Sequence, residues 1–211
     1  ATQSITVNGG GNITLNGGDG SGNNDFARIN ANGTAQNITF NAGGTLALTG
    51  GTVGNNNFAQ IRANNLTPGA QTQTITGATG ITLTGGASGG GLNTGNFAQI
   101  QNSLGSQLII VGSGGLELIG GGGALTDNFA SVFQAGTTGT SQLIQVNSGG
   151  NITLHGGSSA LTNVQPTPPP PYHGSWAFIR GDGNSQEINF TAGGAINITG
   201  GTGGSRNYAG I

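Results

Sequence analysis

The segment NGGGNITLNGG at residues 8–18 decides the fold of this chain, because its pattern recurs along the whole length. Its core is an alternating Ile/Leu-x-Leu/Ile triplet, followed by one residue and then two glycines. The unit occurs six times, as ITLNGG (13–18), LALTGG (46–51), ITLTGG (81–86), LELIGG (116–121), ITLHGG (152–157) and INITGG (196–201). Successive copies start 33, 35, 35, 36 and 44 residues apart, a period typical of repeat proteins.

Two further segments accompany each triplet. Another alternating pair, apolar except at Gln73, lies eight residues before it, at Ile5/Val7, Ile38/Phe40, Gln73/Ile75, Leu108/Ile110, Ile144/Val146 and Ile188/Phe190. A segment with an aromatic residue followed by alanine lies after it, as DFARI (25–29), NFAQI (57–61), NFAQI (96–100), NFASV (128–132), SWAFI (175–179) and NYAGI (207–211). Each copy therefore contains three short segments of strand-like alternation.

These observations predict an all-β chain that folds as one parallel β-solenoid over residues 1–211. Glycine and β-branched residues disfavour helix, and the glycines fall where the chain must turn sharply. Six coils of about 35 residues, with three strands each, would stack into a rod roughly 30 Å long, given about 4.8 Å between strands. The expected coils are 1–33, 34–66, 67–103, 104–136, 137–182 and 183–211.

Stacking would place identical residues above one another in columns. The triplets predict an interior column of Leu15, Leu48, Leu83, Leu118, Leu154 and Ile198. Strict alternation would turn the aromatic residues outward, whereas a bulge at the corner would tuck them inside. We expect inward or half-buried rings, because six exposed aromatics would form an adhesive patch. The residues Asn57, Asn96, Asn128 and Asn207 would form a structural amide ladder at the turn.

The largest interruption of the repeat is a proline-rich insertion at residues 164–174. Four consecutive prolines favour a stiff polyproline II segment, which has no N–H groups to join a sheet. The insertion is either a surface loop that packs on the rod or a protruding contact arm. The residues of such an arm would be Pro168, Pro169, Pro170, Pro171, Tyr172, His173 and Trp176, with the aromatic rings available to stack on a sugar or a neighbouring chain.

Composition excludes several classes of protein. The net charge is −2 and only four arginines are present, so a nucleic-acid surface is not expected. No apolar run approaches the roughly 20 residues that span a bilayer, so membrane insertion is not expected either. The chain has no Cys, which excludes a disulfide scaffold and thiolate metal sites. We expect a secreted protein at the cell surface, on the basis of composition and repeat type.

No catalytic, cofactor-binding or metal-binding set is visible in the sequence. The six acidic residues are dispersed over different corners, whereas a glycan-cleaving solenoid needs closely placed carboxylates. The segment GGDGSGNND at 17–25 only loosely matches a calcium-binding repeat and occurs once. We therefore expect no enzyme. A polysaccharide-active enzyme stays as a minor alternative, for which Asp182 or Glu187 would be required.

The runs NGGGNITLNGG (8–18) and NAGGTLALTGG (41–51) resemble the shaft repeats of filamentous-haemagglutinin-type exoproteins, which are large bacterial adhesins. The resemblance covers essentially the whole chain and lies at the level of the fold. It implies a right-handed β-helix, export across an outer membrane and attachment to surfaces. No Asn-Pro-Asn-Gly turn of the kind found in that family's secretion domain is present, so the resemblance implies a shaft segment or a small relative.

The sequence thus predicts an extracellular structural protein, either a self-assembling filament subunit or an adhesin shaft segment. Its partner would be a second copy stacked head to tail, through an interface formed by Ile5, Val7, Asn207, Tyr208 and Ile211. Alternatively, covalent neighbouring repeats of a longer chain would occupy these positions. The second class of function is a module that binds glycan, a host surface or another protein through the proline-rich arm or the aromatic column.

Overall fold

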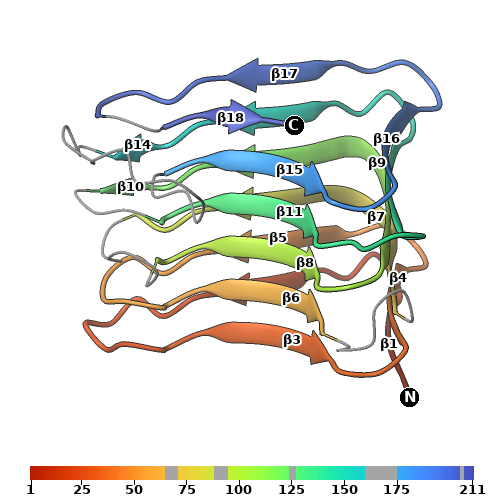
Figure 1. The fold of residues 1–211 in the computed structure, drawn as a ribbon, viewed down its shortest axis with the longest axis horizontal. Coiled ribbons are helices and arrows are strands. Elements are labelled where there is room, and N and C mark those ends of the chain that lie inside the picture. Colours follow the sequence, from red (N-terminus) through yellow and green to blue (C-terminus); the bar gives the residue numbers. More distant parts are fainter. Residues whose placement is uncertain (65–70, 88–94, 124–126, 160–174, 205–206) are drawn as a thin grey trace.

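In the computed structural model, the described residues are 1–64, 71–87, 95–123, 127–159, 175–204 and 207–211. Their regular secondary structure consists entirely of strands, and every named pair of strands is parallel. The coils rise from the N-terminus at the bottom of Figure 1 to β17 at its top. Within the described ranges, no helix is long and apolar enough to cross a membrane.

The strand that opens each copy builds the first face of the solenoid. These strands are β1 (Thr2–Val7), β4 (Ala35–Phe40), the first part of β7 (Thr72–Thr84), the first part of β9 (Ser106–Ile119), β12 (Ser141–Val146) and β16 (Ser185–Phe190). The second face continues from it and contains β2 (Ile13–Asn16), β5 (Thr45–Thr49), the later parts of β7 and β9, β13 (Ile152–His155) and β17 (Ile196–Thr199). Because β7 and β9 run without a break around the corner, the two faces form one bent sheet.

The third face is a separate six-stranded sheet. It contains β3 (Ala27–Ala31), β6 (Ala59–Ala63), β8 (Ala98–Asn102), β11 (Ala130–Gln134), β15 (Ala177–Gly181) and β18 (Ala209–Gly210). A two-stranded sheet of β10 (Gly122–Gly123) and β14 (Ser158–Ser159) lies on the connection that leads to this face.

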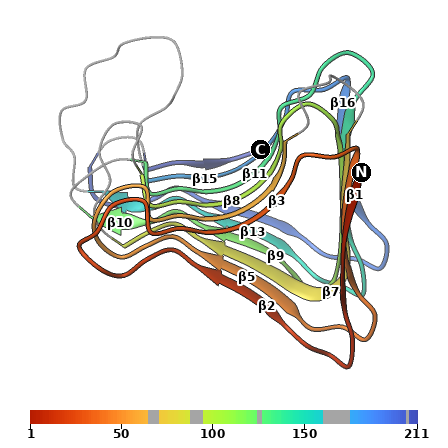
Figure 2. The same cartoon turned by 90° about the horizontal axis from the view of Figure 1, so that it is seen from below.

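The predicted fold class is confirmed. Seen from below in Figure 2, the three faces enclose one core, and the chain runs clockwise as it moves away from the N-terminus, which is the right-handed sense. The solenoid has about five turns, slightly fewer than the six coils expected. The last copy closes only with the two-residue strand β18.

Apolar columns fill the interior. The predicted column on the second face is confirmed for the inner coils, where Leu48, Leu83, Leu118 and Leu154 are fully buried. Each such side chain contributes roughly 1.5–3 kcal/mol by leaving water, but only when the next coil covers it. Ile198 occupies the same column in the last coil and is 48% exposed, because β17 pairs with β13 below it and with no other strand among the described residues.

One expected pair was wrong by a single residue. In β9, the side chains of Ile109 and Val111 are buried, whereas Leu108 and Ile110 lie on the outer side and are only half-buried. Because successive side chains of a strand point to opposite sides, a shift of one residue assigned the outer side chains to the core. The inner position before Ile109 is taken by the buried polar residue Gln107, which the apolar pattern did not reveal.

The two glycines after each triplet fit a corner with no room for side chains. A Cβ on Gly85, the first glycine of its pair, would overlap the carbonyl oxygen of Asn128 in the next coil. The second glycine bonds across its own corner, as Gly86 N donates to Asn96 O over 2.6 Å. In the last copy, a Cβ on Gly200 would meet no atom within 4 Å, because no further coil lies against it in the described part of the chain.

Candidate functional site

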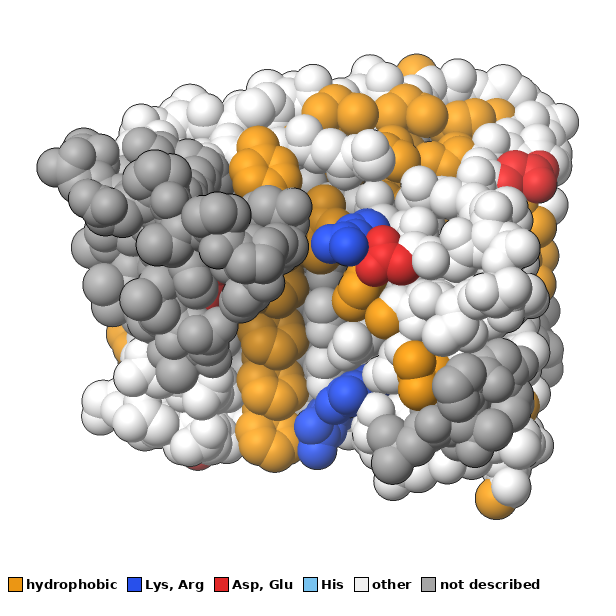
Figure 3. Space-filling model, viewed as in Figure 1, with side chains coloured by type: hydrophobic (Ala, Val, Ile, Leu, Met, Phe, Trp, Pro, Cys, Tyr) orange, Lys and Arg blue, Asp and Glu red, His pale blue; other side chains and the backbone are white. Residues whose placement is uncertain are grey.

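The outer side of the third face carries a continuous aromatic column. The rings belong to Phe26, Phe58, Phe97, Phe129, Trp176 and Tyr208, and their successive centroids are 4.7, 4.7, 4.8, 4.5 and 5.8 Å apart. Neighbouring rings in this series are parallel to within 10°. Figure 3 shows the column as a vertical apolar stripe on this side of the molecule.

This aromatic column faces outward, and three of its six rings are half-buried, while Phe26 and Tyr208 are exposed and Trp176 is buried. The prediction of half-buried rings is confirmed for Phe58, Phe97 and Phe129, whereas tucking inside the core is wrong. The strand begins at the alanine after each ring, and that alanine points inward, so the ring must point out. Since each ring covers the face of the next, only ring edges remain along the inner coils. Along these inner coils the column therefore offers a ligand ring edges and not ring faces.

A polar strip lies beside the aromatic column on the same sheet. Gln60 donates to Gln99 over 2.8 Å, and Gln99 donates to Ser131 over 3.0 Å. Arg28 lies over the ring of Phe26 at 5.0 Å, and Arg62 donates to Ser103 over 3.3 Å. Burial and the nearby positive charge of Arg28 lower the pKa of Arg62. Neither arginine makes an ion pair with any residue in the described part of the chain.

A glutamine ladder runs along the inner side of the first face, buried in its middle coils, and it was not predicted from the sequence. It contains Gln3, Gln36, Gln73, Gln107, Gln142 and Gln186. From Gln36 upward, each side-chain Nε2 donates to Oε1 of the glutamine one coil below, over 2.7–2.9 Å. The signal was present in the sequence, because a glutamine stands two residues before the central apolar residue of this strand in all six copies.

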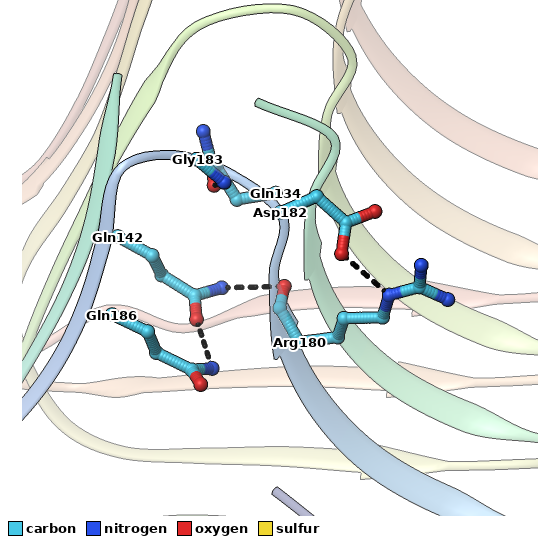
Figure 4. Close-up of polar contacts among 6 residues, drawn as sticks. All are labelled: Gln134, Gln142, Arg180, Asp182, Gly183 and Gln186. Atoms are coloured by element: carbon cyan, nitrogen blue, oxygen red, sulfur yellow. Dashed lines mark hydrogen bonds and ion pairs between the residues drawn. The ribbon is translucent and has the colours of Figure 1, made fainter. Parts of the chain in front are cut away.

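The same amides connect the first face to the third. Gln142 Nε2 donates both to Gln107 Oε1 and to the backbone oxygen of Arg180, the latter over 3.2 Å. Figure 4 shows the bond from Gln142 to Arg180 O and the contact of Gln142 with Gln186 of the next coil. Every amide in the middle of the ladder is thus satisfied by hydrogen bonds within the protein, which makes its burial tolerable.

The predicted asparagine ladder is confirmed for three coils, with a different bonding pattern. Asn57 Oδ1 accepts from the backbone N–H of Asp25 over 2.9 Å, and Asn96 Oδ1 accepts from that of Asn57 over 2.9 Å. Asn128 Oδ1 accepts from the backbone N–H of Asn96 over 3.0 Å. In the fifth coil, Ser175 takes this place, and its buried Oγ has no hydrogen-bond partner among the described residues.

The residues predicted for an assembly interface lie on the first and last coils. Ile5 and Val7 point inward from β1 and pack against the core while staying partly exposed. At the other end, Tyr208 is 38% exposed and Ile211 is 49% exposed, while Asn207 is buried. The chain alone does not bring the two groups together, because they lie at opposite ends of the solenoid (Figure 1).

Most of the predicted contact arm lies outside the described residues. This applies to Pro168, Pro169, Pro170, Pro171, Tyr172 and His173. Trp176 is described and is only 7% exposed, packed between Phe129 and Tyr208 and against Phe178. Its assignment to an exposed arm is therefore corrected: the ring belongs to the aromatic column.

The acidic residues of the described segments are not grouped into a metal site. No cluster of three or more His, Asp or Glu side chains that could hold a metal ion occurs among them. Asp182 forms an ion pair with Arg180, with 2.6 Å between its Oδ1 and the arginine Nε (Figure 4). Glu187 is exposed on the outer side of β16.

Comparisons with protein-family models, with curated proteins and with solved structures find no match to this chain. The parallel solenoid is consistent with the fold-level resemblance to adhesin shafts.

Proposed function

We propose that this protein is an exported structural element, a β-solenoid filament subunit or shaft segment that supports surface attachment or a matrix. The observation that carries the proposal is the uncovered apolar surface of the last coil. Ile196 and Ile198 are 44% and 48% exposed, whereas the residues at the same positions of the four coils below are fully or almost fully buried. Another coil of the same kind, placed above them, would bury them.

The internal construction supports a mechanical role. Backbone ladders, the glutamine ladder and the aromatic column all run parallel to the axis through successive coils. A pull along the axis would load many equivalent hydrogen bonds at once instead of one weak connection. Stability that is spread over like neighbours is typical of repeat proteins, in which each repeat contacts only the adjacent repeats.

Electron microscopy of the purified chain at rising concentration tests the proposal. We expect thin, unbranched fibres whose axial repeat is near six strand spacings, or about 29 Å. Short monomeric rods at every concentration would rule out self-assembly of this chain and leave only the shaft-segment form of the proposal.

A second candidate function is binding of an anionic polysaccharide to the polar strip of the third face. The observation in its favour is the pair formed by Arg28 and Arg62, diagonal neighbours on β3 and β6 without a carboxylate partner in the described segments. Guanidinium groups bind carboxylate and sulfate oxygens with paired hydrogen bonds. The proline-rich arm remains a second proposed contact for the same class of ligand.

Binding to an immobilised sulfated polysaccharide separates these possibilities. We expect Arg28→Gln with Arg62→Gln to weaken binding about tenfold or more, since charge-assisted hydrogen bonds contribute about 1.5–3 kcal/mol each. Arg180→Gln is the control, because this arginine is already paired with Asp182. Binding that is lost only after deletion of residues 164–173 would assign it to the arm.

A further inference from the structure

The glutamine ladder has a direction along the solenoid axis. In all five of its side-chain bonds, the donor Nε2 belongs to the upper coil and the acceptor Oε1 to the coil below. Inner amides donate twice, because Nε2 also reaches a carbonyl of the third face, as Gln73 does to Gln101 O over 3.1 Å. Such a ladder ends in an acceptor at the top and in a donor at the bottom.

The two ends of the ladder are complementary. Gln186 Oε1 accepts no hydrogen bond from the described residues, although the equivalent oxygen of Gln142 accepts one. Gln3 Nε2 donates only to Asn30 O, so one of its two N–H groups has no acceptor in the part of the chain that the structure describes. The top coil therefore offers what the bottom coil needs, at the same position of the coil.

The surfaces around these amides match as well. Ile196 and Ile198 of the top coil share their columns with Ile13 and Leu15 of the bottom coil. A Cβ on Gly200 would meet open space, whereas a Cβ on the equivalent glycines of the lower coils would overlap the next coil. Tyr208 and Phe26, at the two ends of the aromatic column, are both exposed.

We propose that two copies of this chain join in one direction only, with β16 and β17 of one copy pairing in register with β1 and β2 of the next. Gln186 Oε1 of the first copy accepts from Gln3 Nε2 of the second, and Tyr208 stacks on Phe26. The inference rests on the proposed self-assembly and adds its polarity, its register and its contact residues. A junction between two top coils or two bottom coils would place acceptor against acceptor or donor against donor.

Gly200→Ala tests the register without disturbing the single chain. The added Cβ meets nothing within 4 Å in one copy, so the thermal unfolding midpoint should not change. In the proposed junction it would overlap the carbonyl of Asp25 in the next copy, as a Cβ on Gly17 would overlap that of Asn57. We expect the critical concentration for fibres to rise at least about tenfold, equivalent to about 1.4 kcal/mol. Gly210→Ala is the matched control, because this glycine lies in the same coil at an outward-facing position with open space around it.

Cysteine cross-linking tests the polarity, since the natural chain has no cysteine. Ser4 and Glu187 occupy one outward column at the two ends, and the junction would bring their Cα atoms to about 4.8 Å, within disulfide range. Ser4→Cys mixed with Glu187→Cys should give disulfide dimers under oxidation, and neither variant should do so alone.

The outcomes separate the inference from the proposed function. If the unaltered chain and the Gly200→Ala variant form fibres at the same critical concentration, the inferred register is overturned while self-assembly stands. Dimers from either cysteine variant alone would overturn the single direction. If the unaltered chain forms no fibres and the mixed variants do not cross-link, both self-assembly and the inference fail.

Discussion

The buried glutamines of the first face and the buried asparagines before the third face both stack amides one coil apart, but they differ in continuity. Glutamine is present in all six coils, whereas the asparagine column begins with Asp25 and is interrupted at Ser175. The glutamines bond side chain to side chain, and the asparagines bond side chain to backbone N–H. Every residue except proline has a backbone N–H to donate. The asparagine ladder therefore tolerates a different residue in one coil. The glutamine ladder requires the same amide at each step.

Breaking the glutamine ladder in the middle should have the largest effect. Gln107→Leu removes the donor to Gln73 Oε1 and the acceptor of Gln142 Nε2, and both groups stay buried. Two unsatisfied polar groups should lower the free energy of unfolding by about 3 kcal/mol, as measured in urea. Gln186→Leu is the control at the exposed end of the same ladder, where we expect a loss below about 1 kcal/mol. Equal losses from the two variants would contradict the cooperative ladder.

Breaking the asparagine ladder should have a smaller effect. Asn96→Ala removes the acceptor of the Asn57 N–H and the donor to Gly54 O, so we expect a loss of about 2 kcal/mol. Asn41→Ala, which removes only an exposed side-chain bond to Asn8, should change stability by less than about 0.5 kcal/mol. A loss from Asn96→Ala that exceeds the loss from Gln107→Leu would reverse the comparison of the two ladders.

Repairing the asparagine ladder should have the smallest effect, with the opposite sign. Ser175→Asn would replace a buried hydroxyl that has no described partner with the amide that coils two to four carry at this position. We expect a gain of about 1 kcal/mol in the free energy of unfolding. Ser185→Asn, at an exposed position of β16, is the control and should leave stability unchanged. A destabilised Ser175→Asn variant would show that this corner differs from the others in shape.

The repeat period and the alternation within it were enough to predict most of the architecture. Three parallel faces, the leucine column and the asparagine positions followed from the sequence because identical coils that stack must align identical residues. The exchange of inner and outer residues in β9 had one cause. Leu108 and Ile110 are apolar and alternate, but the inner phase was set by Gln107, whose amide is acceptable inside only as part of a ladder.

The sequence by itself determined the fold class, the corners where glycine is needed and the residues that share a column. Only the tertiary structure decided which way the aromatic rings face, which amides bond to side chains and which to backbone, and that the glutamine ladder has a donor end and an acceptor end. The physical reason is that ring orientation depends on the residue at which each strand begins, and hydrogen-bond direction depends on which acceptors the neighbouring coil and the third face bring within reach. A one-dimensional pattern fixes the order of the residues, but these acceptors come together only once the coils are stacked.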